Sequence, residues 1–168
     1  MPVLDGALYT SCIEVLGNAR DHISFQQLVE KLQQEPILGL ENDHVIYYYF
    51  HDYGIGLIYK KYRQSFGGAV FLVDSPNVKR GEMQRYKGGF QTNVTPDDSM
   101  LQIESKIPLV PIGRYQDSNG SGLYYKFQDH QVTFHFDGPG QHLQLALVQL
   151  KQPSKKETHV GAASTLSL

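Results

Sequence analysis

The sequence predicts an α+β protein made of two tandem α-βββ units, with antiparallel sheets and with the helices packed on one face. Two observations lead to this prediction. Segments with helical apolar spacing alternate with segments in which apolar and aromatic residues recur at every second position. The second half also repeats the element order of the first. We place the first unit at residues 1–74, the second at 75–150 with a core shared between the two, and a flexible tail at 151–168.

Composition narrows the class of protein before any motif is considered. The 168 residues suit one medium domain or two small units that share a core, because very small domains bury too little surface alone. With a net charge of −2 the chain has no overall positive potential that would attract a polyanion, so nucleic acid is a poor candidate for its partner. No run approaches the ~20 apolar residues of a membrane span, and no leader pattern opens the chain. With its single cysteine, Cys12, we expect a cytoplasmic protein without a membrane partner.

The first unit begins with two predicted helices. The first covers about residues 5–16, where apolar side chains recur at helical spacing: Leu8, Cys12, Val15 and Leu16. The second starts at a capping box, in which the Ser24 hydroxyl and the Gln27 side chain each satisfy a free backbone N–H group. The pair Glu35-Pro36 ends it, because proline cannot continue a helix.

Three strands are expected to follow in the first unit. From Val45 the apolar period changes from about 3.6 to 2, which indicates strands at residues 45–50 and 55–60. The turn His51-Asp52-Tyr53-Gly54 joins them, since aspartate and glycine supply the backbone freedom of a hairpin turn. Residues 69–73 supply the third strand, and the polar run 74–93 then connects the units over the surface.

The second unit repeats this order. Thr95 is the expected N-cap of a helix that has Pro96 at its first position, and Pro108 ends that helix. The strands expected after it cover residues 123–127, 132–136 and 143–150. A shift of the chain by 77 positions places Y-Y-Y-F-H-D, residues 47–52, on Y-Y-K-F-Q-D, residues 124–129, without a gap. We therefore expect an internal duplication.

The two predicted capped helices at 24–34 and 96–107, the strands after them and the paired Y-Y-x-F-x-D segments carry a resemblance to known families. Their arrangement over residues 5–150 resembles the beta-lactamase inhibitory protein family and the single-copy BamE-like (SmpA-OmlA) modules. The second half also resembles small bacterial toxin-immunity proteins. The chain departs from these families in lacking paired cysteines and a signal peptide, so a secreted inhibitor or a lipoprotein is not implied. The resemblance does imply a protein that binds another protein through the exposed face of its sheet, and it assigns no catalytic residue.

The residues that alternate away from the predicted core form the candidate partner-binding surface. Outward tyrosines are stiff and amphipathic, which suits them as anchors in protein interfaces. With Tyr62 from the loop after the second strand, the expected contact residues are Tyr47, Tyr49, Ile58, Tyr62, Tyr124, Lys126 and His135. Alternating aromatics also occur in half-buried strands that bind nothing, and Tyr48 and Tyr125 are expected to face the core for that reason.

The sequence gives weaker support for nucleic-acid binding, metal binding and acid–base catalysis. A base-stacking platform would use the same aromatics but needs a positive groove, and only the middle of the chain, residues 60–87, has a basic excess. The seven histidines show neither the spacing of a helical zinc site nor a cysteine partner, so we expect no metal. His51 with Asp52, or Asp129 with His130, would supply an acid–base pair, but both pairs lie in predicted turns where aspartate has a backbone role.

The sequence therefore favours a non-enzymatic bacterial binding protein that needs no cofactor. Its most specific form is an immunity or inhibitor protein that occludes a toxin or an enzyme with an aromatic sheet face. The alternative is a small-molecule-binding or enzymatic α+β domain with a cleft between the two units. A deep closed pocket lined by His51, His130 and tyrosine hydroxyls would favour that alternative. Self-association is a third use of the exposed surface.

Overall fold

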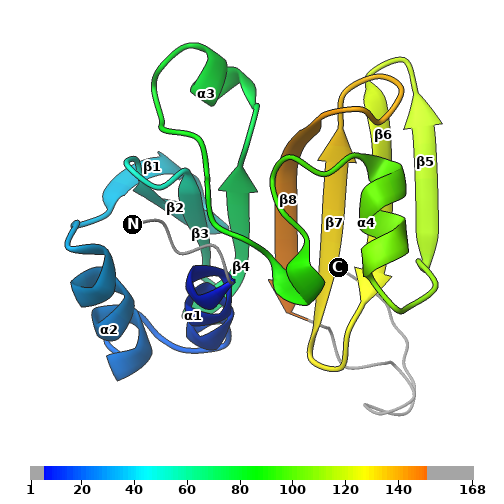
Figure 1. Ribbon diagram of the computed structural model, residues 1–168. Helices are drawn as coiled ribbons and strands as arrows, with labels where there is room; N and C mark the ends of the chain where they lie inside the picture. The colour runs from blue at the N-terminus through cyan, green and yellow to red at the C-terminus, as the bar shows by residue number, and fades with distance from the viewer. Residues whose placement is uncertain (1–5, 151–168) are drawn as a thin grey trace.

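A single antiparallel sheet of eight strands forms the centre of the fold (Figure 1). The structure, a computed structural model, describes residues 6–150, so the tail expected at 151–168 lies outside the described residues. The strands lie in the order β1-β2-β3-β4-β8-β7-β6-β5. The first four strands and the last four are thus two meanders, which meet where β4 pairs with β8.

Helices and strands occupy separate runs of the described chain, which is typical of an α+β protein. The helical elements are α1 (Ala7–Val15), α2 (Ile23–Leu32), α3 (Pro76–Lys79), the 3-10 turn η1 (Gln91–Asn93) and α4 (Met100–Lys106). The first meander contains β1 (Ile37–Glu41), β2 (Val45–Phe50), β3 (Ile55–Lys60) and β4 (Ser65–Leu72). The second contains β5 (Gly113–Asp117), β6 (Gly120–Lys126), β7 (His130–Phe136) and β8 (Leu143–Leu150). The predicted α+β class with antiparallel strands is confirmed.

Each half contains four strands where the sequence predicted three. The missed strands are β1 and β5, which form the two edges of the sheet. All five residues of β1 are exposed, and β5 is only half-buried at alternate positions, so neither shows the apolar alternation that identifies an inner strand. The antiparallel sheets expected for the two units are one eight-stranded sheet, because backbone pairing between β4 and β8 joins the two halves.

Two helices begin at other residues than predicted. His22 is the N-cap of α2, and its Nδ1 accepts a hydrogen bond from the Ser24 backbone N–H at 3.1 Å, so Ser24 lies inside the helix. In α4 the capping box consists of Ser99 and Gln102, four positions after the predicted cap Thr95. In both helices a second residue near the start also fits a capping pattern, and the sequence indicated that residue as the N-cap.

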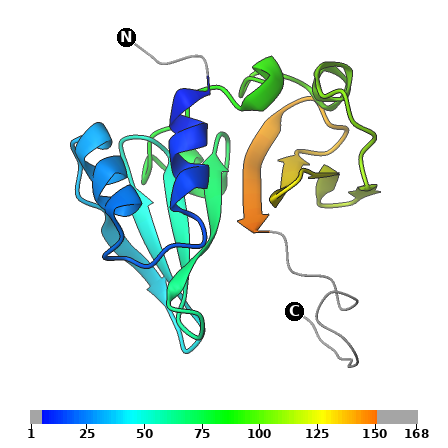
Figure 2. The ribbon, with the colours of Figure 1, turned by 90° about the horizontal axis from the view of Figure 1, so that it is seen from below.

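Helices cover one side of the sheet and leave the other uncovered. Seen from below in Figure 2, α1, α2 and α4 all lie on the same side. In β2 the side chains facing the helices, Ile46, Tyr48 and Phe50, are buried, whereas those facing the other way are half-buried. We call the uncovered side the open face.

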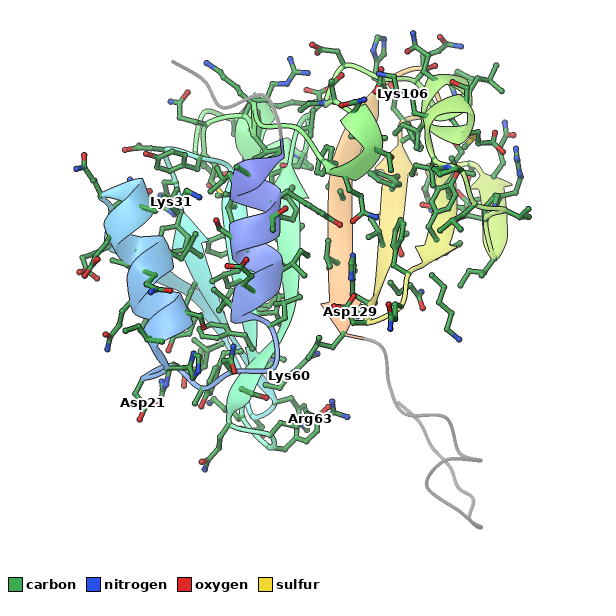
Figure 3. The ribbon with its side chains drawn as sticks, turned by 60° about the horizontal axis from the view of Figure 1, so that its bottom comes forward. Asp21, Lys31, Lys60, Arg63, Lys106 and Asp129 are labelled. Carbon is green, nitrogen blue, oxygen red and sulfur yellow. The ribbon has the colours of Figure 1, made fainter. Side chains whose placement is uncertain are left out.

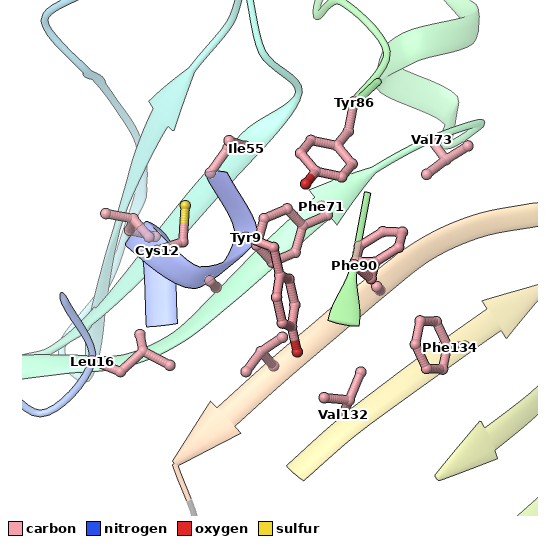
Figure 4. Close-up of a cluster of buried hydrophobic side chains, with 14 of the residues drawn as sticks. Tyr9, Cys12, Leu16, Ile55, Phe71, Val73, Tyr86, Phe90, Val132 and Phe134 are labelled. Carbon is pink, nitrogen blue, oxygen red and sulfur yellow. The ribbon is translucent and has the colours of Figure 1, made fainter. Parts of the chain in front are cut away.

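Aromatic side chains close the helix side over the junction of β4 and β8 (Figure 4). Phe90, from the segment that crosses between the halves, packs against Phe71 of β4 and Phe134 of β7, with ring centroids 5.7 and 5.8 Å away. Tyr9 of α1 lies 5.3 Å from the Phe71 ring. All four side chains belong to one buried cluster, so the two halves share a core.

Candidate functional site

Strand pairing fixes which side chains meet on the open face. One row of directly opposite residues crosses six strands, from the first half to the second: Tyr49, Gly56, Val70, Leu147, Thr133 and Tyr124. A second row lies beside it: Leu72, Leu145, His135, Gly122 and Tyr115. Because opposite residues in antiparallel strands have Cβ atoms about 5 Å apart, the side chains of each row are neighbours, except at Gly56 and Gly122, where a tyrosine ring from the next strand lies over the backbone.

The middle of the open face is hollowed. A cavity of about 450 Å³ lies over the junction of β4 and β8 and opens away from the helices. Aliphatic side chains from these two central strands make its floor: Val70, Leu72, Leu145 and Leu147. Aromatic side chains from both halves line it further out: Tyr47, Tyr49, Tyr115 and His135. Asn77, Asn119 and Gln144 add polar groups to the lining, so the hollow is a mainly apolar site that both halves build.

Two stacked tyrosines form the wall on β2. The rings of Tyr47 and Tyr49 are 5.8 Å apart between centroids and 15° from parallel. The Tyr49 ring lies over Gly39 and Gly56, and a Cβ atom added at Gly56 would come within 2.9 Å of it. Burial raises the pKa of Tyr49, and the neighbouring Tyr47 adds to the rise, so its hydroxyl remains protonated at neutral pH.

A tyrosine and a histidine form the opposite wall, on β5 and β7. The Tyr115 hydroxyl oxygen lies 2.5 Å from Nδ1 of His135. Burial lowers the pKa of His135, which favours the neutral imidazole, and a neutral Nδ1 can accept the proton that the hydroxyl donates. Burial also raises the pKa of Tyr115. The Tyr115 ring lies over Gly122 as Tyr49 lies over its own glycines, so the two walls are built alike.

The structure brings together most, but not all, of the predicted contact residues. Those that line the hollow are Tyr47, Tyr49, Ile58 and His135. Tyr124 lies just outside, with its ring centroid 5.9 Å from that of Tyr115. Lys126 stands at the end of β6, and Tyr62 is 67% exposed in the β3–β4 turn, outside the hollow. Ile58 is only 7% exposed, so it supports Tyr47, its partner across the strands, and offers little contact area itself.

Sequence reasoning missed the floor of the hollow and one of its wall residues. Tyr115 belongs to β5, which was not predicted as a strand. Leu145 and Leu147 belong to β8, whose sequence L-Q-L-A-L-V-Q-L is apolar on both faces. A strand in the middle of a sheet loses its alternation in this way, and its sequence does not reveal which residues face the open side.

Unpaired positive charge lies at one end of the open face. Lys60 and Lys126 take open-face positions near the β3–β4 and β6–β7 turns, and Figure 3 shows Lys60 and Asp129, which mark these turns, at the same end of the sheet. Within residues 6–150 neither lysine makes an ion pair. Asp117, at an open-face position of β5, lies at the other end and accepts a hydrogen bond from the Asn119 backbone N–H at 2.7 Å. This end of the open face therefore carries two lysine charges that no ion pair within residues 6–150 neutralises.

A separate polar cluster lies on the helix side of the sheet. His130 is 6% exposed, and its Nδ1 is 2.6 Å from Oδ1 of Asp129. The hydrogen bond with His130 lowers the pKa of Asp129. Nε2 lies 3.5 Å from the hydroxyl of Tyr9 in α1, and the Phe127 ring stacks on the imidazole with centroids 5.2 Å apart. The histidine–aspartate pair therefore exists, but protein atoms enclose its imidazole, and it links β7 to α1.

Two further features bear on reactivity in the described chain: the Cys12 thiol and the grouping of the side chains that could ligate a metal. Burial raises the pKa of the Cys12 thiol to about 12, which makes it a poor nucleophile. Residues 6–150 contain no group of three or more His, Cys, Asp or Glu side chains that could hold a metal ion. None of the helices in this range has the length and apolar character needed to cross a bilayer.

Comparison with known proteins gives no information about the function of this site. The chain matches no protein-family model, no curated protein and no solved structure. A function must therefore be argued from the open face and its hollow.

Proposed function

We propose that the protein binds another protein on its open face and acts by occlusion, without catalysing a reaction. The observation that carries this proposal is the hollow of about 450 Å³, which has an aliphatic floor and tyrosine walls. Protein interfaces owe most of their affinity to a few large side chains that fill desolvated pockets inside a polar rim. The hollow offers such a pocket to an apolar anchor of the partner, and the tyrosine hydroxyls and the two lysines offer the rim.

The form of this function that we favour is an immunity or inhibitor protein for a bacterial toxin or enzyme. The resemblance to the beta-lactamase inhibitory protein family implies binding through the face of a sheet, and an uncovered face with a central hollow supports that use. Occlusion needs only affinity and shape. The enclosed imidazole of His130 is consistent with a protein that performs no acid–base chemistry on its partner.

We also infer that the site arose by duplication. The offset of 77 positions that places Tyr47 on Tyr124 also places Ile23, the first residue of α2, on Met100, the first residue of α4. The same offset places β1 over β5 and β3 over β7. Each copy would then supply one wall of the hollow, and their junction would supply the floor.

Leu147→Arg is the variant that tests the proposed function. Leu147 is half-buried on the floor, so an arginine there would fill the hollow with its stem while its charged head reaches water. We expect the wild-type protein, used as bait in a lysate of its source organism, to retain one partner, and we expect the purified partner to bind the variant about tenfold or more weakly.

The matched control for that variant is Leu101→Arg, on α4. Leu101 is 76% exposed on the helix side of the sheet, so this variant adds the same charge far from the hollow and should leave binding unchanged. Calorimetry with the purified partner measures both affinities, and thermal unfolding shows that both variants fold. A partner that binds folded Leu147→Arg as tightly as the wild type would rule out the open face as its site.

The second candidate function, binding of a small molecule or an enzymatic reaction in a cleft between the halves, has one observation in its favour. A volume of about 450 Å³ over the junction lies within the range of ligand pockets. Against it, neither His51 nor His130 lines this hollow, which opens broadly on one face. A rise in melting temperature with amphipathic small molecules, abolished in Leu147→Arg, would favour this candidate over protein binding.

A further inference from the structure

A cavity separate from the hollow lies among the helices of the first half. Its volume is about 360 Å³, and α1, α2, the β2–β3 turn and residues 84–88 of the segment that crosses between the halves surround it. No residue of the described chain lines both this cavity and the hollow on the open face. We call it the helix-side pocket. Its volume lies at the lower end of the range of small-molecule sites.

Apolar and aromatic side chains form the body of the helix-side pocket: Leu8, Leu32, Tyr53 and Tyr86. Tyr86 is fully buried, and its ring centroid lies 4.8 Å from that of Phe71, so this wall belongs to the core (Figure 4). The Tyr86 hydroxyl donates a hydrogen bond to the Gly89 carbonyl oxygen at 2.7 Å. The Tyr53 hydroxyl likewise donates to the Leu32 carbonyl oxygen at 2.9 Å. Because both hydroxyl protons are already engaged, these walls suit a ligand with an apolar or aromatic body.

Backbone contacts hold the wall at residues 84–86 in place. The Gln84 backbone N–H donates to the His51 carbonyl oxygen at 2.8 Å, next to the β2–β3 turn. The Tyr86 backbone N–H donates to the carbonyl oxygen of Leu72, the last residue of β4, also at 2.8 Å. A Cβ atom added at Gly54 would come within 2.5 Å of the Gln84 carbonyl oxygen, so the segment packs directly on the turn. A ligand therefore enters a pocket whose walls are already ordered, which lowers the cost of binding.

Positive charge predominates in the lining of the helix-side pocket, whose charged side chains are Lys31, Arg85, Lys87 and Asp52. Arg85 is paired with Asp97, at 2.6 Å. Lys31 and Lys87 make no ion pair within residues 6–150. The Lys31 ammonium donates one hydrogen bond to the Ser11 hydroxyl at 2.8 Å, between α1 and α2 (Figure 3), and keeps two hydrogens for a ligand. Two ammonium groups without an ion pair against one carboxylate favour an anion.

We propose that the helix-side pocket binds a small monocarboxylate with an apolar or aromatic body. The body lies against the apolar walls, and the carboxylate meets the ammonium groups of Lys31 and Lys87. Apolar walls with a few charged groups are the usual design of a small-molecule site, in which the charges fix the orientation of the ligand. This site does not depend on the protein binding proposed for the open face, because the two cavities share no lining residue within the described chain.

An NMR titration of the full chain with phenylacetate tests the site. Amide shifts should saturate at millimolar ligand or below, and they should move at residues 31–32, 52–53 and 84–88 but not at Val70 or Leu147 of the hollow. Phenethyl alcohol and phenethylamine keep the carbon skeleton and replace the carboxylate by a neutral and a cationic group. Both should bind about tenfold or more weakly, because neither can pair with the lysines.

Variants of Lys87 test the role of the charge. Lys87→Gln should weaken phenylacetate binding about threefold or more, and Lys87→Glu should weaken it further because it adds a repulsive charge. Lys126→Gln is the matched control, since it removes a lysine without an ion pair from the open face and should leave phenylacetate binding unchanged. Leu147→Arg should also bind phenylacetate as the wild type does, which separates this site from the one on the open face.

Three results would overturn the proposal. The first is a chain whose amides at residues 84–88 do not move with phenylacetate. The second is phenethylamine that binds as tightly as phenylacetate, because the pocket would then not select an anion. The third is a loss of affinity in Lys126→Gln equal to that in Lys87→Gln, which would reveal an effect of net charge alone. Circular dichroism melting verifies that the lysine variants remain folded.

Discussion

Single residues shape the open face through tyrosine rings that lie over glycines. Tyr49 covers Gly56, and Tyr115 covers Gly122, and in each case the tyrosine and the glycine are opposite each other on adjacent strands. A glycine in a strand leaves the backbone bare, and a ring from the adjacent strand can cover it by lying flat. These rings are therefore held at fixed positions around the hollow, which lowers the entropy that they would lose when a partner binds.

His135 should make the stability of the fold depend on pH near neutrality. Burial holds its pKa below the ordinary value of 6.5 in the folded chain, whereas the unfolded chain has the ordinary value. Below pH 6.5 the unfolded chain binds a proton that the folded chain binds more weakly, so stability falls as the pH falls from 6.5 to the lowered folded pKa and changes no further below it. Above pH 6.5 the histidine is neutral in both states and this loss is absent.

The variant His135→Gln checks this expectation, because glutamine does not titrate but can still accept a hydrogen bond from Tyr115. Urea denaturation above and below pH 6.5 should show that the variant loses less stability on acidification than the wild type. The comparison cancels the contribution of the other histidines. An equal loss in both proteins would mean that His135 titrates alike in the folded and unfolded chains.

At the scale of elements, the start of α4 rests on a reciprocal pair of hydrogen bonds. The Ser99 hydroxyl accepts from the Gln102 backbone N–H at 3.3 Å, and the Gln102 side chain accepts from the Ser99 backbone N–H at 2.8 Å. Ser99→Ala should therefore lower the free energy of unfolding by about 1 kcal/mol. Thr95→Ala, at the cap that the sequence suggested, should lower it less. Urea denaturation of both variants decides between the two caps, and a larger loss for Thr95→Ala would contradict the assigned helix start.

Elements could be predicted from the sequence where one face is buried and the other is not. β2 was recognised because its residues alternate, and the alternation also assigned Tyr47 and Tyr49 to the open face. β1 lacks this signal because it is exposed on both sides, and β8 lacks it because it is apolar on both sides. The floor of the hollow and the edge strands depend on which strands become neighbours, which is a property of the whole sheet.

At the scale of the whole molecule, the two halves cannot be separated without opening the core. β4 and β8 pair along five residues each, and Phe90 fills the space above that junction between Phe71 and Phe134. Phe90 is 2% exposed and contacts aromatic rings from both halves. The hollow on the opposite side of the sheet has its floor on the same two strands. Stability of the junction and integrity of the proposed site are therefore coupled.

Phe90→Ala should test whether the chain unfolds as one unit. Removing this buried ring leaves a cavity at the junction, and the expected loss is about 3–5 kcal/mol in the free energy of unfolding. Because the cavity adjoins both meanders, amide hydrogen exchange should show that β3 and β7 lose protection by the same amount. Leu101→Ala, at a residue 76% exposed, should change stability by no more than about 0.5 kcal/mol. If β7 lost protection while β3 kept it, the halves would be independent folding units, and a hollow built from both would require them to dock after folding.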